Sequence, residues 1–351
     1  MKTITVNASR HYNIFVGSGL LHMLSDYIKQ IKQPCKAVII SDTNVWPLYG
    51  ETAASSLIAA GFDVSSYVFT AGESSKNAET YISILNYLAE KNITRSDCLV
   101  ALGGGVVGDI TGFVAATFLR GIDYIQVPTS LLAMVDSSVG GKTAIDLPGG
   151  KNLAGAFWQP RIVLCDIKVL SSLPRDVFLD GCAEVIKYGV LFDEKLFNDL
   201  EENGPDFSLE ETIAKCITWK RDVVIQDEFD TGERQKLNLG HTVGHAVEKI
   251  SDYTISHGRA VAAGMSIISR ASSQYGYCAY ADCQRICSIL EQFELPCSTD
   301  YSVKQLISIM LSDKKRFGET VSLIVPRSIG NCDICPFPIS ELDSFIKAGL
   351  L

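Results

Sequence analysis

The sequence lacks several features that would place it outside the ordinary globular enzymes. It has no run of about 18 uncharged apolar residues, the length that a membrane-spanning helix needs. Its first twenty residues alternate polar and apolar side chains instead of forming the apolar segment of a secretory signal. Positive charge is in deficit, because 31 lysines and arginines face 40 aspartates and glutamates, for a net charge of −9. These absences predict a cytoplasmic protein and argue against a membrane or a nucleic acid as its main partner.

Cysteine is present, but without the spacing of a disulfide or zinc framework. The 11 cysteines are an odd number and are scattered through apolar runs. Cys332 and Cys335 form a C-x-x-C pair, yet no second pair completes four zinc ligands, and no βαβ pattern surrounds it. A second cluster, Cys278, Cys283 and Cys287, also lacks zinc-site spacing. We predict reduced thiols, which are typical of a cytoplasmic chain.

The 351 residues are enough for about two domains. Short β-rich runs alternate with helical patterns through the first half, the strands at 36–41, 65–69, 98–103, 124–128 and 162–166, and the helices at 51–60, 78–91 and 108–119. This alternation predicts an α/β domain with a parallel sheet. From about residue 172 long helical patterns follow one another and strand signals nearly stop. We therefore predict an α/β domain over 1–172 and a mostly helical domain over 173–351.

A glycine run, LGGGVVGDITGF, follows the strand at 98–103 and opens a helix. Gly103, Gly105 and Gly108 satisfy G-x-G-x-x-G, in which glycines let the backbone approach a pyrophosphate at a helix N-terminus. The run departs from an orthodox dinucleotide fold because it lies on a late strand and no ribose-binding acid ends the next strand. Asp42, directly after the strand at 36–41, is a candidate acid. The alternative is a turn whose glycines only pack helix on strand.

A second glycine run, SSVGGKTAID, invites comparison with a phosphate-binding P-loop. That motif requires glycine where this chain has Asp136, and no helix pattern follows Lys142. The P-loop hypothesis therefore fails. The segment from 121 to 160 is nevertheless dense in Asp136, Lys142, Lys151 and Asn152 among glycines, a composition typical of loops that face a ligand.

Histidine is rare, with five in the chain, but three of them lie within 17 residues. His241 and His245 are four residues apart and share a helical face, and His257 follows. The H-E-x-x-H pattern of metalloproteases is absent because Thr242 occupies the glutamate position. Two or three imidazoles with one carboxylate, for which Glu184 is a candidate, would suit a divalent metal of the zinc type. The alternative is that these histidines lie on a helix surface or are hydrogen-bonded in the core.

Cations accompany these groups in an otherwise acidic chain, at Lys187, Lys220, Arg234, Lys314 and Lys315. Beside a metal and a dinucleotide they indicate an anionic substrate. Singly, each is also what a solvated surface carries.

In order along nearly the whole chain, GGGVVGD, RGIDYIQVPTSLLAMVDSSVGGKTAID, GKNLAGAFWQP, AEVIKYG, RQKLNLGHTVGH and DKK resemble the 3-dehydroquinate synthase family. The resemblance implies a Rossmann-like parallel-sheet domain that binds NAD, followed by a helical domain that binds Zn²⁺ or Co²⁺. It implies conversion of 3-deoxy-D-arabino-heptulosonate 7-phosphate, an anionic small molecule, into 3-dehydroquinate and phosphate in the shikimate pathway. Hydride would pass to NAD and back, with phosphate elimination, ring opening and an intramolecular aldol step.

The resemblance also implies the site residues. The metal ligands would be Glu184, His241 and His257. NAD would be contacted by residues of the first domain, namely Asp42, Asn44, Glu73, Lys76, Gly104, Gly105, Val106, Asp109, Thr129, Ser130, Lys142, Lys151, Val169, Leu170, Ser171 and Ser172. The substrate would meet charged and polar side chains, namely Asp136, Lys142, Asn152, Lys187, Lys220, Arg234, Asn238, His245 and one of Lys314 and Lys315. Arg120 would reach into the neighbouring subunit's site, which implies a homodimer.

Three positions depart from the family's usual pattern: Met134 in place of glutamine, Ser130 in place of threonine, and Glu233 in place of an apolar residue. None of these changes removes an implied ligand. Three alternatives share the architecture. The first is a cyclase such as 2-deoxy-scyllo-inosose or 2-epi-5-epi-valiolone synthase, whose substrate lacks a carboxylate. The second is a glycerol dehydrogenase, which has no use for so many cations facing the substrate. The third is a non-catalytic NAD-sensing module, which should have lost metal ligands or lysines.

Overall fold

The computed structural model describes the chain except for residues 312–315, 318 and 351. Its contacts divide the chain into two compact units. The first comprises Met1–Leu173 and Leu209–Phe229, and the second comprises Pro174–Ser208 and Asp230–Leu351.

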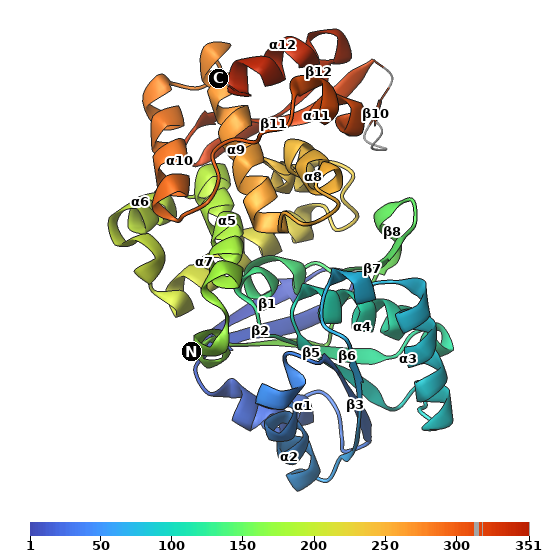
Figure 1. Ribbon diagram of the computed structural model, residues 1–351. Helices are drawn as coiled ribbons and strands as arrows, with labels where there is room; N and C mark the ends of the chain where they lie inside the picture. Colours follow the sequence, from blue (N-terminus) through green and yellow to red (C-terminus); the bar gives the residue numbers. More distant parts are fainter. Residues whose placement is uncertain (312–315, 318, 351) are drawn as a thin grey trace. The chain divides into compact units, whose positions relative to one another are not determined.

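A seven-stranded sheet forms the centre of the first unit (Figure 1). Its order is β1-β2-β9-β6-β5-β3-β4, and every neighbouring pair from β2 to β4 is parallel. The strands are β1 (Lys2–Asn7), β2 (His11–Gly17), β3 (Lys36–Asp42), β4 (Asp63–Phe69), β5 (Cys98–Gly103), β6 (Asp123–Pro128) and β9 (Ile162–Asp166). The five predicted strands are all present, so the predicted α/β class is confirmed. The antiparallel pair β1–β2 lies outside the predicted strands, although the polar–apolar alternation of the first twenty residues is the signal of such a pair.

Helices cover both faces of this sheet (Figure 1). They are α1 (Leu24–Lys29), α2 (Glu51–Ala59), α3 (Ala78–Glu90) and α4 (Gly105–Thr117). Leu88 of α3 and Ile110 of α4 are fully buried in one cluster with Leu99 of β5. Strand β5 is buried along its whole length, as expected for a parallel strand covered on both faces. Helix α4 begins three residues before the predicted start because Gly104, not a later residue, is its N-cap.

A hairpin replaces the loop that the glycine-rich segment 121–160 indicates. Strands β7 (Lys142–Leu147) and β8 (Gly150–Phe157) pair antiparallel, with Leu147 opposite Gly150. Glycine is required at position 155, where β8 pairs with β7, because a Cβ there would lie 2.2 Å from the carbonyl oxygen of Thr143. The alternation in this segment is masked by its small residues, so sequence patterning shows little sign of the strands.

Helix α7 (Leu209–Gln226) belongs to the first unit, whereas the sequence boundary at 172/173 places it in the second domain. It packs against β1 and the short helix η5 (Ala133–Ser137). Glu210 pairs with the N-terminal ammonium at 2.6 Å, and Lys220 pairs with Asp136 at 2.8 Å. These contacts join segments far apart in the sequence. Helical periodicity describes only local order, so it could not predict them.

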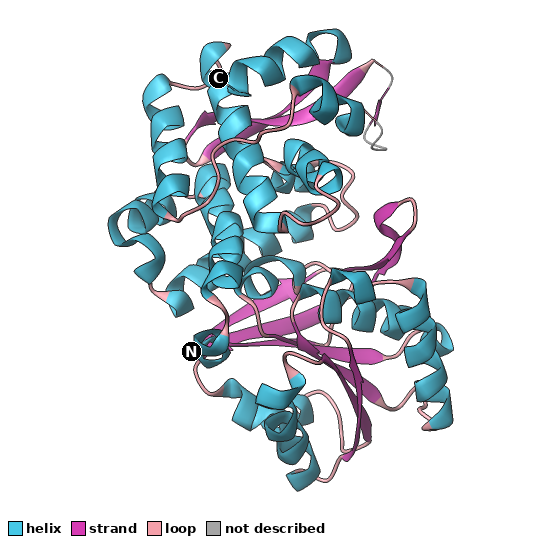
Figure 2. Cartoon of the chain, in the orientation of Figure 1, coloured by secondary structure: helices cyan, strands magenta, loops and turns pink. Residues whose placement is uncertain are grey.

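The second unit is mostly helical and carries a small antiparallel sheet (Figure 2). Its helices are α5 (Arg175–Phe192), α6 (Glu194–Asn203), α8 (His241–Ile250), α9 (His257–Gln274), α10 (Tyr280–Gln292), α11 (Val303–Met310) and α12 (Ile339–Leu350). The sheet is β10 (Arg316–Phe317), β11 (Thr320–Ser328) and β12 (Asn331–Pro338). The prediction that long helices follow residue 172 agrees with these elements, but the sequence patterns did not predict the sheet. Pro336 and Pro338 weaken the strand signal of β12, which tolerates them because it lies at the edge of the sheet.

Glycines let α8 and α9 cross closely. A Cβ at Gly264 would lie 2.0 Å from the carbonyl oxygen of Gly240, and one at Gly244 would lie 3.0 Å from that of Ala260. The close crossing places His257, the first residue of α9, beside α8. The ring centroids of His241 and His257 are 5.1 Å apart.

Within the residues that the structure describes, every helix is too short or too polar to cross a bilayer. The eleven cysteines carry free thiols.

Candidate functional site

Twelve of the sixteen residues predicted to bind NAD lie at or after the carboxyl ends of four parallel strands of the first unit. Asp42 ends β3, Gly103 ends β5, Thr129 follows β6, and the short helix η6 (Ile167–Ser172) follows β9. Ligands of open parallel sheets bind at this edge. Segments 120 residues apart are joined here, since the Tyr49 hydroxyl donates to the Val169 carbonyl oxygen at 3.0 Å.

The glycine run combines two roles. A Cβ at Gly103 would lie 2.4 Å from Val107 Cγ2, and one at Gly108 would lie 2.8 Å from Gln126 Oε1, so these glycines pack helix against sheet. Gly104 and Gly105, at the start of α4, meet nothing closer than 3.5 and 3.3 Å. No side chain caps this N-terminus. Its amides can therefore receive an anion, while the packing alternative holds for the other two glycines.

Asp42 is held by its own turn. Its Oδ1 accepts hydrogen bonds from the backbone N–H groups of Asn44 and Val45, both at 2.9 Å. The Asn44 side chain is exposed beside it. The carboxylate is 9% exposed, with one oxygen committed to the turn.

A cation cluster lies within the first unit. Lys76 Nζ is 2.6 Å from both Asp109 Oδ2 and Asn152 Oδ1, and the lysine is 4% exposed. Lys151 Nζ is 3.6 Å from Glu73 Oε1. Burial raises the pKa of the Asp109 carboxyl, an effect that Lys76 opposes. Five predicted residues thus take part in two ion pairs and one hydrogen bond of the same unit.

Asn152 is part of this cluster through an unusual backbone. Its φ is 55°, and its N–H donates to Asp146 Oδ1 at 2.8 Å. Asp146, whose N–H donates to the Lys76 carbonyl oxygen at 2.7 Å, was not predicted. Its only sequence signal is its place in the polar segment before the hairpin turn.

The remaining predicted residues of the first unit divide by exposure. Lys220 is 5% exposed and also donates to the carbonyl oxygen of Asp136. Lys142, at the start of β7, is exposed, and so is Arg120. Leu119 and Arg120 both have positive φ, 51° and 67°, and form a tight corner before β6.

In the second unit, Glu184, His241 and His257 come together as predicted. Glu184 Oε1 lies 3.6 Å from Nε2 of His241 and 3.6 Å from Nε2 of His257, and the three ligand atoms lie within 4.8 Å of one another. Atoms that share a tetrahedral zinc at about 2.1 Å are about 3.4 Å apart. The donor set, one carboxylate oxygen and two imidazole nitrogens, is that of a catalytic zinc with an open position. The residues therefore fit a divalent metal.

The second ring nitrogen of each histidine is also bonded. Nδ1 of His241 lies 3.1 Å from the Leu239 carbonyl oxygen, which can only accept, so this nitrogen carries the hydrogen. Nδ1 of His257 lies 3.3 Å from Glu248 Oε2. Both rings thereby present Nε2 to Glu184, as metal-ligating histidines do. Glu248 was not predicted, although it shares a helical face with His241 and His245.

The surroundings shift the pKa values of the two imidazoles in opposite directions. Burial lowers the pKa of His241 well below its ordinary value, and Lys187 adds to the effect. Burial alone would also lower the pKa of His257, but the carboxylates of Glu184 and Glu248 raise it to about 10.

The other described residues of the second unit that were predicted to bind substrate are buried or half-buried. Lys187 is 1% exposed and pairs with Glu184 one turn away on α5. Arg234, in the short helix η8 (Glu233–Asn238), is 2% exposed, while Asn238 and His245 are half-buried. The predicted Lys314 and its neighbour Lys315 lie outside the described residues.

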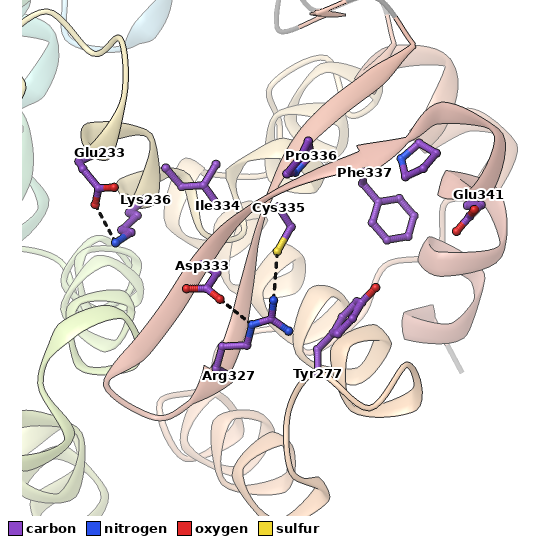
Figure 3. A pocket seen from close by; sticks show the side chains of 11 residues that line it. Glu233, Lys236, Tyr277, Arg327, Asp333, Ile334, Cys335, Pro336, Phe337 and Glu341 are labelled. Atoms are coloured by element: carbon purple, nitrogen blue, oxygen red, sulfur yellow. Dashed lines mark hydrogen bonds and ion pairs between the residues drawn. The ribbon is translucent and has the colours of Figure 1, made fainter.

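A cavity of about 520 Å³ lies in the second unit between β11, β12 and η8 (Figure 3). Its eleven lining residues include none of the predicted site residues. Four of its five charged side chains form two ion pairs, Glu233 with Lys236 at 2.7 Å and Arg327 with Asp333 at 2.8 Å. We assign it no part in the chemistry.

The architecture is shared with solved structures of sugar phosphate cyclases. A 2-deoxy-scyllo-inosose synthase complexed with carbaglucose-6-phosphate, NAD⁺ and Co²⁺ has a TM-score of 0.89 and 25% identity, over 99% of this chain and 100% of that one. The 2-epi-5-epi-valiolone synthase of Streptomyces hygroscopicus subsp. jinggangensis 5008, with NAD⁺ and Zn²⁺ bound, has a TM-score of 0.89 and 22% identity, over 99% and 98%. At that identity the second likeness concerns the fold alone.

Sequence comparison narrows the class to one family. The family models of the 3-dehydroquinate synthase N-terminal and C-terminal regions match residues 66–180 and 181–316. A 3-dehydroquinate synthase of Clostridium acetobutylicum is 43% identical, over 99% of this chain and 99% of that protein. The chain belongs to the 3-dehydroquinate synthase family, and the sequence-based assignment is confirmed.

Proposed function

We propose that this protein catalyses the reaction of its family, the conversion of 3-deoxy-D-arabino-heptulosonate 7-phosphate into 3-dehydroquinate and phosphate. It would act as a carbon–oxygen lyase of the shikimate pathway. The observation that carries the proposal is the cluster of buried Glu184 and His241 with half-buried His257, in a chain 43% identical over 99% of its length to a 3-dehydroquinate synthase. Identity to the two cyclases that make other products is lower, 25% and 22%, which favours this substrate over theirs.

We infer NAD and a divalent metal, zinc or cobalt, as cofactors. Solved structures that share the fold contain NAD⁺ with Co²⁺ or with Zn²⁺. The start of α4, at Gly104 and Gly105, would hold the pyrophosphate, and Glu184, His241 and His257 would hold the metal. The chemistry supplied by the bound groups is storage and return of a hydride by NAD and Lewis-acid polarisation of a substrate hydroxyl by the metal.

The protein's own cations would hold the anionic substrate. Arg234 offers a permanently charged planar fork for carboxylate or phosphate, and Lys187 a buried ammonium. Asn238 and His245 are half-buried and would orient the substrate's hydroxyl groups. Further substrate contacts follow from the family resemblance, at Asp136, Lys142, Asn152 and Lys220. Fixed charges at a dry site lower the barrier by positioning the anion and its reactive conformer.

The proposed reaction is tested by measuring phosphate release from the heptulosonate phosphate with and without NAD. We expect release that requires NAD but leaves no NADH, because the hydride taken up early in the cycle is returned. NADH accumulating in step with turnover would contradict the proposal and would favour a polyol dehydrogenase.

We further infer a homodimer in which Arg120 serves the neighbouring subunit's phosphate site. Its exposure and its strained corner, with positive φ at both Leu119 and Arg120, support a role outside its own unit. Arg120→Ala should lose substrate affinity and keep NAD and metal. Mixing it with an inactive Lys187→Ala chain should then restore activity, because some heterodimers regain one complete site. Failure to restore activity after subunit exchange would overturn the shared site.

We also infer a cytoplasmic location, which the eleven free thiols support, since reducing compartments keep cysteines unpaired.

A further inference from the structure

Helix α8 carries a buried acid that the proposed function does not use. Glu248 is 2% exposed. It stands seven residues after His241 and three after His245, so all three side chains share one face of the helix. An ionised carboxylate is costly to bury unless it is paired or hydrogen-bonded, so its contacts indicate its purpose.

One contact of the Glu248 side chain is with a proposed metal ligand, His257. Its Oε2 lies 3.3 Å from Nδ1 of His257, while Nε2 of the same ring lies 3.6 Å from Glu184 Oε1. The imidazole is therefore set between two carboxylates. Because only Nε2 faces the ligand cluster, the contact at Nδ1 determines how the ring is turned.

His241 shows the same arrangement with a different acceptor. Its Nδ1 donates to the Leu239 carbonyl oxygen at 3.1 Å, a backbone group two residues away. Like His241, His257 is the first residue of its helix, but the acceptor at its Nδ1 is a side chain and not a nearby backbone carbonyl. The acceptor instead comes from the neighbouring helix, and the glycine crossing of α8 and α9 brings it within reach.

We propose that Glu248 is a positioning residue of the metal centre, which accepts the Nδ1–H of His257 and holds Nε2 toward the metal. The inference rests on the proposed metal site. An acceptor behind a ligating imidazole fixes its tautomer and orientation and raises its basicity, and losing one costs about 10- to 100-fold in metal affinity.

A second arrangement must be distinguished from this one. His245, Glu248 and His257 also offer ligand atoms within 4.8 Å of one another, so Glu248 would be a ligand itself if a metal lay there. Glutamine separates the two roles. Its amide oxygen still accepts a hydrogen bond from Nδ1–H, but as a neutral group it is a much poorer metal ligand than a carboxylate.

The experiment measures Zn²⁺ affinity by competition with a chelator in the wild type and four variants. Glu248→Ala should bind zinc about 10- to 100-fold more weakly, and Glu248→Gln less than about tenfold. The exposed Glu291→Gln, on α10 of the same unit, is the matched carboxylate control and should equal the wild type. His257→Ala should lose more affinity than either Glu248 variant.

The visible absorption of the Co²⁺ forms supplies a readout that a loss of packing would not move. Glu248→Gln should keep the wild-type band shape, with its metal-free thermal unfolding unchanged. Zinc affinity of Glu248→Ala equal to the wild type would overturn the inference, and so would a Glu248→Gln protein as impaired as His257→Ala, with an altered spectrum, which would make Glu248 a ligand. If His257→Ala itself bound zinc as tightly as the wild type, the proposed metal site would be wrong instead.

Discussion

The two units hold their buried polar groups in opposite ways. In the first, Lys76 meets Asp109 and Asn152 at 2.6 Å each, so the cation is neutralised by the protein itself. In the second, Glu184 Oε2 is paired with Lys187, but Glu184 Oε1 lies 3.6 Å from Nε2 of His241 and 3.6 Å from Nε2 of His257, too far for hydrogen bonds and close to the spacing of metal ligands. The first cluster is complete when the chain folds, whereas the second has the spacing of the ligand set that we propose to bind a divalent metal.

Their energetics should differ accordingly. A paired lysine contributes to folding before any ligand arrives, and the loss of its partner leaves a buried charge. A convergent ligand set contributes through the metal, because binding to the folded state alone adds stability by mass action. Metal removal and the substitution of Lys76 should each affect one cluster and spare the other.

Metal removal should have the largest effect. We expect a strong chelator to lower activity more than about a hundredfold, since a Lewis acid is worth several kcal/mol in the transition state. Zinc or cobalt should restore activity. Without metal, the free energy of unfolding of the second unit should fall by the linkage free energy of metal binding, and its melting temperature should fall with it. NAD affinity, measured by calorimetry, should be retained because the residues proposed to bind NAD belong to the first unit and include none of the proposed metal ligands. A parallel loss of NAD binding would show that the two sites are not independent.

Lys76→Met should have the next largest effect, on stability. It leaves Asp109, whose side chain is 18% exposed, without its ammonium, and we expect a loss of about 3 kcal/mol in the free energy of unfolding. The double variant Lys76→Met with Asp109→Leu should recover most of this loss. The exposed Lys29→Met is the control and should change stability by less than about 0.5 kcal/mol. Equal effects of the two lysine variants in urea unfolding would mean that the buried pair contributes nothing.

How far the sequence predicted this structure depends on the range of the contacts. Strand β5 and the start of α4 follow from local patterns, a buried apolar run and a glycine turn, and both are present. The place of α7 depends on contacts such as Lys220 with Asp136, 84 residues apart, which periodicity does not contain. The sheet of β11 and β12 was missed because prolines in β12 suppress its strand signal.

The sites divide in the same way. The rarity of histidine singled out His241 and His257, and the family resemblance gave their roles, which remain predictions. Glu248 was missed because a glutamate on an amphipathic helix normally faces solvent, and only the crossing of α8 and α9 shows that it is buried. The contact between Lys76 and Asp109 spans 33 residues and has no local signal.

The glycines of the first unit separate cofactor binding from packing. Gly105→Ala adds a Cβ 3.3 Å from Ser137 Oγ at the open start of α4, and we expect about tenfold weaker NAD binding, because the backbone must approach the pyrophosphate closely, with little change in stability. Gly103→Ala adds one 2.4 Å from Val107 Cγ2 and should cost about 1–3 kcal/mol of folding free energy through overpacking. Calorimetric NAD titration and urea unfolding of both variants check the contrast. Unchanged NAD affinity in Gly105→Ala would favour a packing role for the whole run.

The smallest effect concerns alkaline pH. Burial alone would lower the pKa of Lys76, but Asp109 and Glu73 raise it above its ordinary value of 10.5. A group whose pKa is raised on folding contributes stability that is complete below the unfolded pKa and is lost as the pH rises through the folded one. The stability gap between the wild type and Lys76→Met should therefore be constant from pH 7 to 9 and should shrink above 10.5, by less than about 1 kcal/mol at pH 11. The gap between the wild type and Lys29→Met should show no such change. A gap that already narrows between pH 7 and 9 would mean that desolvation outweighs the carboxylates, and that the first cluster is less complete than its distances indicate.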